Sequence, residues 1–167
     1  LFFGHMEHQN NNIDPNANLK LDVSLVLKYV IFDTNSHFMI VQDVINQLHN
    51  LAPLAYAEDF DNVGLLIGDK NQPVSGILVT LDTLEAVVDE AIGNNCNLIV
   101  SFHPIIFKEL KKLTGKTYVE RVVIKAIQHN IAIFSIHTAL DNAVEGVNSI
   151  ICDQLGLKNK KILIPQS

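Results

Sequence analysis

The sequence has little cysteine, and this scarcity limits the class of protein. Cys96 and Cys152 are the only cysteines and no Cys-x-x-Cys pair occurs, which excludes a disulfide framework and a zinc ribbon. Isolated cysteines of this kind are usually small buried apolar residues of a reducing compartment. We therefore expect both thiols to be free and buried, and the protein to be cytoplasmic.

Long apolar runs and concentrated positive charge are also lacking. No apolar stretch reaches the roughly eighteen residues that a membrane span needs, and the start lacks the charged segment and cleavage site of a signal peptide. The formal charge is -6, and the 12 Lys and Arg residues form no basic stripe. We therefore expect no membrane partner and no non-specific nucleic-acid binding, because such binding depends on neutralising phosphates.

The apolar content itself is high. With 48% hydrophobic and 18% charged residues, the 167-residue chain is typical of one compact domain. Residues 1–38 differ, because an Asn-rich stretch, 9–18, precedes an apolar run, 19–32, that predicts a strand or a short helix. Gly4-His5-Met6 resembles the remnant of an expression tag. We interpret 1–38 as a leader or tag and expect the folded domain over 39–167, starting at Met39.

Within 39–167 the hydrophobic pattern predicts alternating helices and strands. Helical spacing of apolar residues marks the first helix, and Pro53 closes it. Two short β-rich runs around a turn-prone segment then predict a hairpin. The expected helices cover 39–51, 82–93, 118–130 and 147–155, and the expected strands cover 63–67, 76–81, 97–101, 131–136 and 161–164.

This alternation predicts an α/β fold, a mixed and largely parallel sheet flanked by helices. The last expected strand begins at Lys161, close to the end of the sequence. We therefore expect the domain to be truncated, that is, incomplete at its C-terminal end.

Candidate metal ligands follow three of the expected strands. Asp82 and His137 each come directly after a strand, His103 follows its strand after one residue, Phe102, and Asp141 follows His137 closely. Ligands of open parallel sheets collect at the carboxyl ends of the strands, and imidazole and carboxylate groups suit zinc, manganese, iron or nickel. The pattern predicts a divalent-metal site with His103 and Asp141 as ligands, while His137 could bind metal, orient Asp141 or cap its strand.

Each of these side chains also has an ordinary structural interpretation. His103 could be a hydrogen-bonded loop histidine, and Asp141 could cap a turn before the last helix. Asp82, with Glu85 three residues later, fits a helix start and is left outside the metal shell. No phosphate-binding glycine loop and no nucleophile elbow occur. The one basic cluster fits a solvated loop or, alternatively, a phosphate contact, and it consists of Lys108, Lys111, Lys112 and Lys116.

Three segments together resemble a known family. They are DFDNVGLLIG at 59–68, SFHPIIF at 101–107 and HTALD at 137–141. In this order and spacing they are similar to the GTP cyclohydrolase type 2 homolog family, also known as the NGG-interacting-factor-three-like family, from Met39 to about Leu157. The resemblance implies a di-metal site in each full-length subunit, a ring-shaped homohexamer and an activity that is not well defined.

The resemblance also assigns individual residues. The family's His-His-Pro motif matches Phe102-His103-Pro104, so the second histidine is present and the first is phenylalanine. The family's His-Thr-x-Leu-Asp segment matches His137 and Asp141. A further histidine and a glutamate come, in the family, from a C-terminal segment beyond Ser167, so the site implied for this chain is incomplete.

Two functions are consistent with this resemblance. The first is a metal-dependent hydrolase acting on a nucleotide-like substrate, with Asp61 of the Asp-Asn-Val-Gly signature either near the substrate or part of a structural turn. The second is a non-enzymatic metal-binding scaffold or protein-interaction module, which the phenylalanine at position 102 favours.

Overall fold

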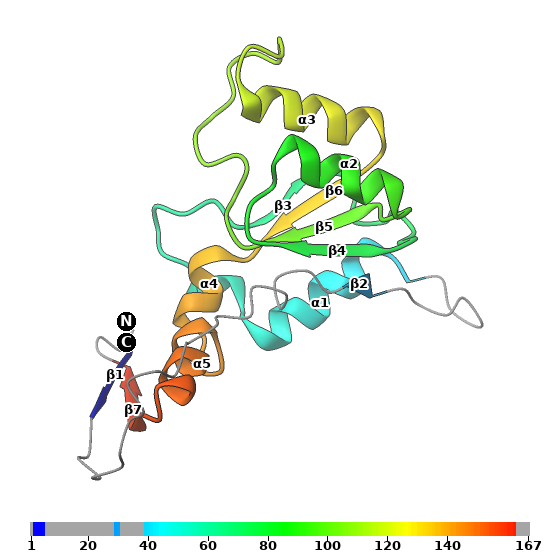
Figure 1. Ribbon diagram of the computed structural model, residues 1–167. Helices are drawn as coiled ribbons and strands as arrows, with labels where there is room; N and C mark the ends of the chain where they lie inside the picture. Colours follow the sequence, from blue (N-terminus) through cyan, green and yellow to red (C-terminus); the bar gives the residue numbers. More distant parts are fainter. Residues whose placement is uncertain (1, 6–28, 31–38, 163–167) are drawn as a thin grey trace, which may run out of the picture.

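The centre of the molecule is a five-stranded sheet with the strand order β2-β4-β5-β6-β3 (Figure 1). The structure, a computed structural model, describes residues 2–5, 29–30 and 39–162. The three central strands, β4 (Ile77–Thr80), β5 (Leu98–Ser101) and β6 (Ala132–Ser135), run parallel to one another. The two edge strands are antiparallel to their neighbours, and they are β3 (Gly64–Ile67) on β6 and β2 (Tyr29–Val30) on β4. The predicted mixed, largely parallel sheet is confirmed.

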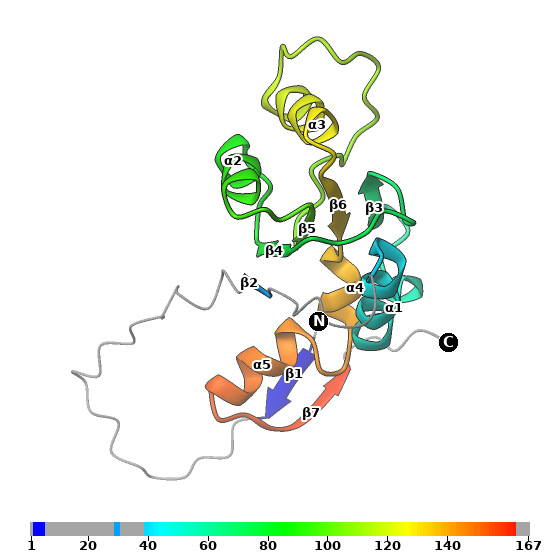
Figure 2. The same ribbon diagram turned by 90° about the vertical axis from the view of Figure 1, so that its right-hand side faces the viewer.

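Helices cover both faces of this sheet. α1 (Val41–Leu51) lies on one face, while α2 (Glu85–Gly93) and α3 (Tyr118–Gln128) lie on the other (Figure 1). Past the carboxyl ends of the central strands the chain forms two further helices, α4 (His137–Asn142) and α5 (Val147–Gln154). β7 (Lys158–Ile162) follows and pairs with β1 (Phe2–His5), away from the main sheet (Figure 2).

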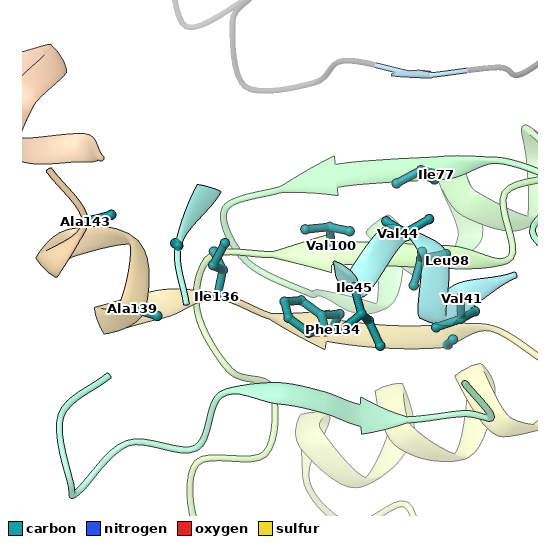
Figure 3. Packing of buried hydrophobic residues seen from close by; sticks show 12 residues of the cluster. Val41, Val44, Ile45, Ile77, Leu98, Val100, Phe134, Ile136, Ala139 and Ala143 are labelled. Atoms are coloured by element: carbon teal, nitrogen blue, oxygen red, sulfur yellow. The ribbon is translucent and has the colours of Figure 1, made fainter. Parts of the chain in front are cut away.

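The core consists of two layers because side chains alternate along each strand. Leu98, Val100 and Phe134 pack toward α1, where Val44 and Ile45 meet them (Figure 3). The intervening residues point the other way and pack with α2 and α3; the buried members of this second layer include Leu78, Ile99, Ile133, Val88 and Val122. Full burial of each such large side chain stabilises the fold by about 1.5–3 kcal/mol. Both faces of the sheet are therefore covered, as the continuous apolar runs of β5 and β6 require.

α2 and α3 are also joined through charged side chains. Arg121 Nε lies 2.7 Å from Glu85 Oε1, and Lys125 Nζ lies 2.6 Å from Asp89 Oδ1. These pairs are partly exposed, so each adds only about 0–1 kcal/mol. The apolar contacts beneath them supply most of the stabilisation.

The predicted hairpin between the first two strands is wrong. β3 pairs with β6, and β4 lies on the other side of β5, so the two strands are not neighbours. The segment between them bonds to the start of α1 instead: the Val41 N–H donates to the Gln72 carbonyl at 2.9 Å and the Val74 N–H to the Met39 carbonyl at 2.8 Å. Those backbone groups are thus satisfied without a turn between paired strands.

Several smaller expectations can be compared with the structure. Cys96 and Cys152 are free and buried, as predicted. The Asn-rich stretch and most of the apolar run at 19–32 lie outside the described residues, as do 163–167. In the described part of the chain, no helix combines the length and apolarity needed to cross a membrane.

Candidate metal centre

Four chain segments meet at the carboxyl edge of the central strands. Asp82 follows β4, His103 follows β5 and His137 follows β6. β3 runs antiparallel to β6, with Gly64 opposite Ser135, so the residues that precede β3 arrive at this same edge. Asp61 is thereby placed beside His137, although the two are far apart in the sequence.

His103 is bound to Asp82. The Nδ1 atom of His103 lies 2.8 Å from Oδ1 of Asp82, and the two side chains are 46% and 53% exposed. The prediction that Asp82 starts a helix is wrong: α2 begins at Glu85, and its N-cap is Leu84. The carboxylate turns toward the imidazole of the neighbouring strand end instead of capping the helix.

His137 is bound to Asp61 in a more enclosed pair. Its Nδ1 atom lies 2.9 Å from both carboxylate oxygens, and the Asp61 side chain is 0% exposed. The carboxylate also accepts hydrogen bonds from the Thr138 hydroxyl, from the Thr138 N–H at 3.2 Å and from the Asn62 N–H at 2.7 Å. Burial alone raises the pKa of Asp61, but the hydrogen bonds from Thr138, His137 and Asn62 outweigh it and hold the pKa below its ordinary value.

The backbone at His137 is strained. Its φ of +26° is unusual for a residue with a side chain, and such outliers cost on the order of 1–3 kcal/mol each. They persist where surrounding contacts hold them, and here Asp61 binds both the His137 ring and the following residue, Thr138. This conformation starts α4, a short helix that the sequence patterns did not predict.

Three aromatic rings gather at the same place. The centroids of His103 and His137 are 5.4 Å apart, and the Phe102 ring lies 5.0 Å from His103 and 5.4 Å from His137, all in edge-on arrangements. Phe102 is partly buried against the core below the site. The two imidazoles therefore share an apolar neighbour and cannot gain a third nitrogen donor from it.

Asp141 lies one helical turn after His137, on α4. Residues four apart share a face of a helix, which places Asp141 on the His137 side. Burial raises the pKa of Asp141; the charges of His137 and His103 lower it and that of Asp61 raises it, so that the pKa lies above its ordinary value. Its carboxylate is thus electrostatically linked to both histidines.

The structure brings together only part of the predicted metal shell. Within the described ranges, no three His, Cys, Asp or Glu side chains are gathered closely enough to hold a metal ion. The ring centroids of His103 and His137 are nevertheless at a suitable separation, because two imidazoles on one metal ion have centroids roughly 5 Å apart. Each histidine also binds a carboxylate through Nδ1, as metal-ligating histidines do, so the donors present fit a metal ion in part.

Two contributors were not identified from the sequence. Asp82 lies after the end of its strand as His103 does, but its spacing to Glu85 indicates a helix start instead. Thr138, whose hydroxyl binds Asp61, lies in the HTALD segment, but that pattern gives the threonine no role of its own. Only the pairing of β3 with β6 brings Asp61 and Thr138 into contact.

The fold and these side chains define an α/β protein with two carboxylate-bound histidines at the carboxyl edge of its sheet. Residues 39–166 match the family model Duf34/NIF3 (NGG1p interacting factor 3), and the chain belongs to this family. The similarity implied by its three sequence segments is thereby confirmed.

Relatives in several organisms support this membership. The GTP cyclohydrolase 1 type 2 homolog of Clostridium acetobutylicum is 42% identical over 123 residues, which cover 74% of this chain and 46% of the relative. NIF3-like protein 1 of Bos taurus is 37% identical over 138 residues, which cover 81% of this chain and 36% of the relative. The chain therefore spans less than half the length of these relatives.

Solved structures share the fold. A Bacillus cereus protein related to NIF3 matches with a TM-score of 0.74 and 36% identity, covering 79% of this chain and 37% of that chain. A hypothetical protein of Staphylococcus aureus matches with a TM-score of 0.73 and 40% identity, covering 78% of this chain and 37% of that chain. The α/β architecture described above is thus that of a part of these longer proteins.

Proposed function

We propose that the protein binds a divalent metal ion through His103 and Asp141, with His137 as a further donor, and that it acts as a hydrolase on a nucleotide-like substrate. The observation that carries this proposal is the pair of imidazole rings 5.4 Å apart, each bound to a carboxylate through Nδ1. This arrangement leaves both Nε2 atoms available as donors. Zinc, manganese, iron and nickel all accept such a donor set.

The shell that this chain supplies is small. Its two imidazoles and one carboxylate are not gathered closely enough in the described residues to hold an ion by themselves. The family resemblance places a further histidine and a glutamate in a segment that the longer relatives possess. We therefore expect weak metal binding by this chain and a di-metal site only in subunits that include that further segment. When bound, a divalent metal supplies Lewis-acid activation of water and polarises the group that is cleaved.

The substrate class is proposed from two observations. The similar bacterial proteins are named GTP cyclohydrolase 1 type 2 homologs, which suggests a nucleotide-like ligand. In addition, the loop after β5 carries four exposed lysines that can contact phosphate, namely Lys108, Lys111, Lys112 and Lys116. No described side chain stands out as a general base, so the water would be activated by metal alone.

A scaffold function is the second candidate, and Phe102 favours it. Its ring stands beside both histidines at the position where the family resemblance expects another histidine. A phenylalanine at that position removes one of the donors on which the proposed metal catalysis depends. In this alternative the protein holds metal for stability and offers its surface to partners.

The metal assignment can be tested by removing each donor. His103→Ala and Asp141→Ala should each lower the zinc or manganese bound per chain, measured by elemental analysis after dialysis against a metal buffer, while circular dichroism stays unchanged. His129→Ala is a matched control, because His129 is exposed at the other end of the sheet, after α3. Unchanged metal content in both test variants would contradict the assignment.

The two functions are separated by turnover. The chain and a longer relative, the GTP cyclohydrolase 1 type 2 homolog of Clostridium acetobutylicum, each loaded with manganese, zinc or iron, should be incubated with GTP and other nucleotides, and products should be followed by chromatography. Product formation that is lost in His103→Ala supports the hydrolase. Metal binding without turnover under every metal supports the scaffold.

A further inference from the structure

Both histidines of the candidate site contact an aspartate carboxylate through the same ring atom, Nδ1. Nδ1 of His103 contacts Asp82 and Nδ1 of His137 contacts Asp61, at 2.8 Å and 2.9 Å. An ionised carboxylate can only accept a hydrogen bond, so in each pair the proton of the neutral imidazole must lie on Nδ1. The partner of Nδ1 thereby decides which nitrogen keeps a free lone pair.

Asp61 is itself held by contacts that leave it little freedom. Its side chain is fully buried, and both oxygens accept backbone N–H groups, one from Asn62 at 2.7 Å and one from Thr138 at 3.2 Å. The Thr138 hydroxyl binds the same carboxylate. The carboxylate therefore fixes the ring of His137 at the strained start of α4.

Asp82 holds His103 less firmly. Both side chains are about half exposed, at 53% and 46%, so water competes for the same hydrogen bond. The same aspartate–histidine hydrogen bond is thus present once in a buried pair, Asp61 with His137, and once in an exposed pair, Asp82 with His103. The effect of burial on this contact can therefore be compared within one molecule.

We propose that Asp61 and Asp82 are positioning residues that keep the proton of His137 and His103 on Nδ1, so that both Nε2 lone pairs point away from the carboxylates and are free to bind a ligand. This assigns Asp61 to the orientation of His137 and not to the substrate. The proposal rests on the proposed metal function for its purpose, but the protonated nitrogen can be observed without any metal.

The first experiment determines the tautomer directly. Long-range proton–nitrogen correlation spectra of the metal-free chain, recorded at about pH 8, above the ordinary histidine pKa, distinguish a proton on Nδ1 from one on Nε2. We expect both His103 and His137 to carry the proton on Nδ1. The amide of Asp82→Asn can either donate to Nδ1 or accept from it, so it no longer fixes the proton there, and the share of His103 protonated on Nε2 should rise while His137 is unchanged. Protons on Nε2 in the unaltered chain would overturn the proposal.

The second experiment measures the consequence for binding. Affinity for Co²⁺, followed by its visible absorption, should fall about 10–100-fold in Asp61→Asn, as expected when the carboxylate behind a metal-binding histidine is lost. Asp82→Asn should cause a smaller loss because its pair is exposed. Asp59→Asn is the control, since it removes an exposed carboxylate two residues from Asp61 and should leave affinity unchanged.

Asp61→Asn also places an amide against two backbone N–H groups, so this variant can unfold locally. Asp82→Asn does not share that problem and keeps the proposal testable. If no form of the chain binds Co²⁺, the proposed metal function fails, and the tautomers still decide the positioning role. If folded Asp82→Asn and folded Asp61→Asn both bind Co²⁺ as tightly as the unaltered chain does, the positioning role is wrong although the metal function stands.

Discussion

Phe102 affects both the packing and the number of possible metal donors at this site. Its ring lies beside the rings of His103 and His137, and the side chain packs against the core cluster that contains Phe134 and Val100. The side chain therefore stabilises the edge of the sheet while it occupies a position next to both candidate donors. A histidine at position 102 would therefore lose apolar contact with the core and gain a nitrogen that can bind metal.

Phe102→His should raise metal affinity at some expense of stability. A third imidazole beside His103 and His137 adds a donor, so we expect affinity for Co²⁺ to rise about tenfold or more, equal to about 1.4 kcal/mol or more. Calorimetric titration measures the affinity, and thermal unfolding measures the lost packing. Phe102→Leu is the control, because it loses the ring without gaining a donor. An equal affinity in both variants would show that position 102 does not face the metal.

At the scale of elements, the start of α3 is fastened to the preceding loop by a buried acid. Glu120 accepts hydrogen bonds from the N–H and the hydroxyl of Thr114, both at 2.8 Å, and from the Lys116 N–H at 3.1 Å. The Thr117 hydroxyl, the N-cap of α3, also bonds to Glu120. These contacts hold the end of the lysine-bearing loop in place.

This acid predicts a dependence of stability on pH. Hydrogen bonds from Thr114 lower the pKa of Glu120 from 4.5 to about 2, so the folded state binds its proton less readily than the unfolded state does. The resulting stabilisation is complete above about pH 4.5 and is lost as the pH falls toward about 2. Urea unfolding of the unaltered chain and of Glu120→Gln should therefore show a difference in free energy that shrinks over this range.

Glu109→Gln serves as the comparison for that experiment, because Glu109 is exposed on the same loop. A difference between the unaltered chain and Glu120→Gln that stays constant from pH 6 to pH 2 would contradict the role of the carboxylate charge.

The elements themselves were predictable wherever the signal is local. The periodicities of α1, α3 and β5 follow directly from burial of one helix face or of both faces of a central strand. Local patterns do not report which strands pair, so the hairpin was predicted wrongly. They also missed α4, because its first residue adopts a conformation that only its tertiary contacts maintain.

At the scale of the whole molecule, the chain corresponds to a part of longer proteins. It spans 46% of the Clostridium acetobutylicum relative and 33% of the Bacillus subtilis relative. The activity, substrates and partners of such full-length proteins are proposals for this chain, including the homohexamer that the family resemblance implies. Several apolar side chains on or next to α5 of this chain are exposed, namely Val144, Ile150, Ile151 and Leu155.

Self-association through this region is a testable consequence of the proposed ring. Light scattering of the purified chain should give a mass several times the 18.6 kDa of one chain. Ile151→Glu should lower that mass, because it places a charge on an apolar side chain that is 47% exposed. Gln154→Glu, at an exposed polar position of the same helix, should have no effect. A monomeric unaltered chain would contradict the proposed assembly.

The sequence by itself determined the fold class, the buried free cysteines and the edge of the sheet at which acids and histidines collect, because burial patterns and strand order along the chain are local properties. Only the tertiary structure decided the partners within that edge. Asp61 meets His137 because β3 pairs with β6, and Asp82 meets His103 because β4 and β5 are adjacent. Contacts between distant segments depend on strand pairing, and strand pairing depends on the packing of the whole chain.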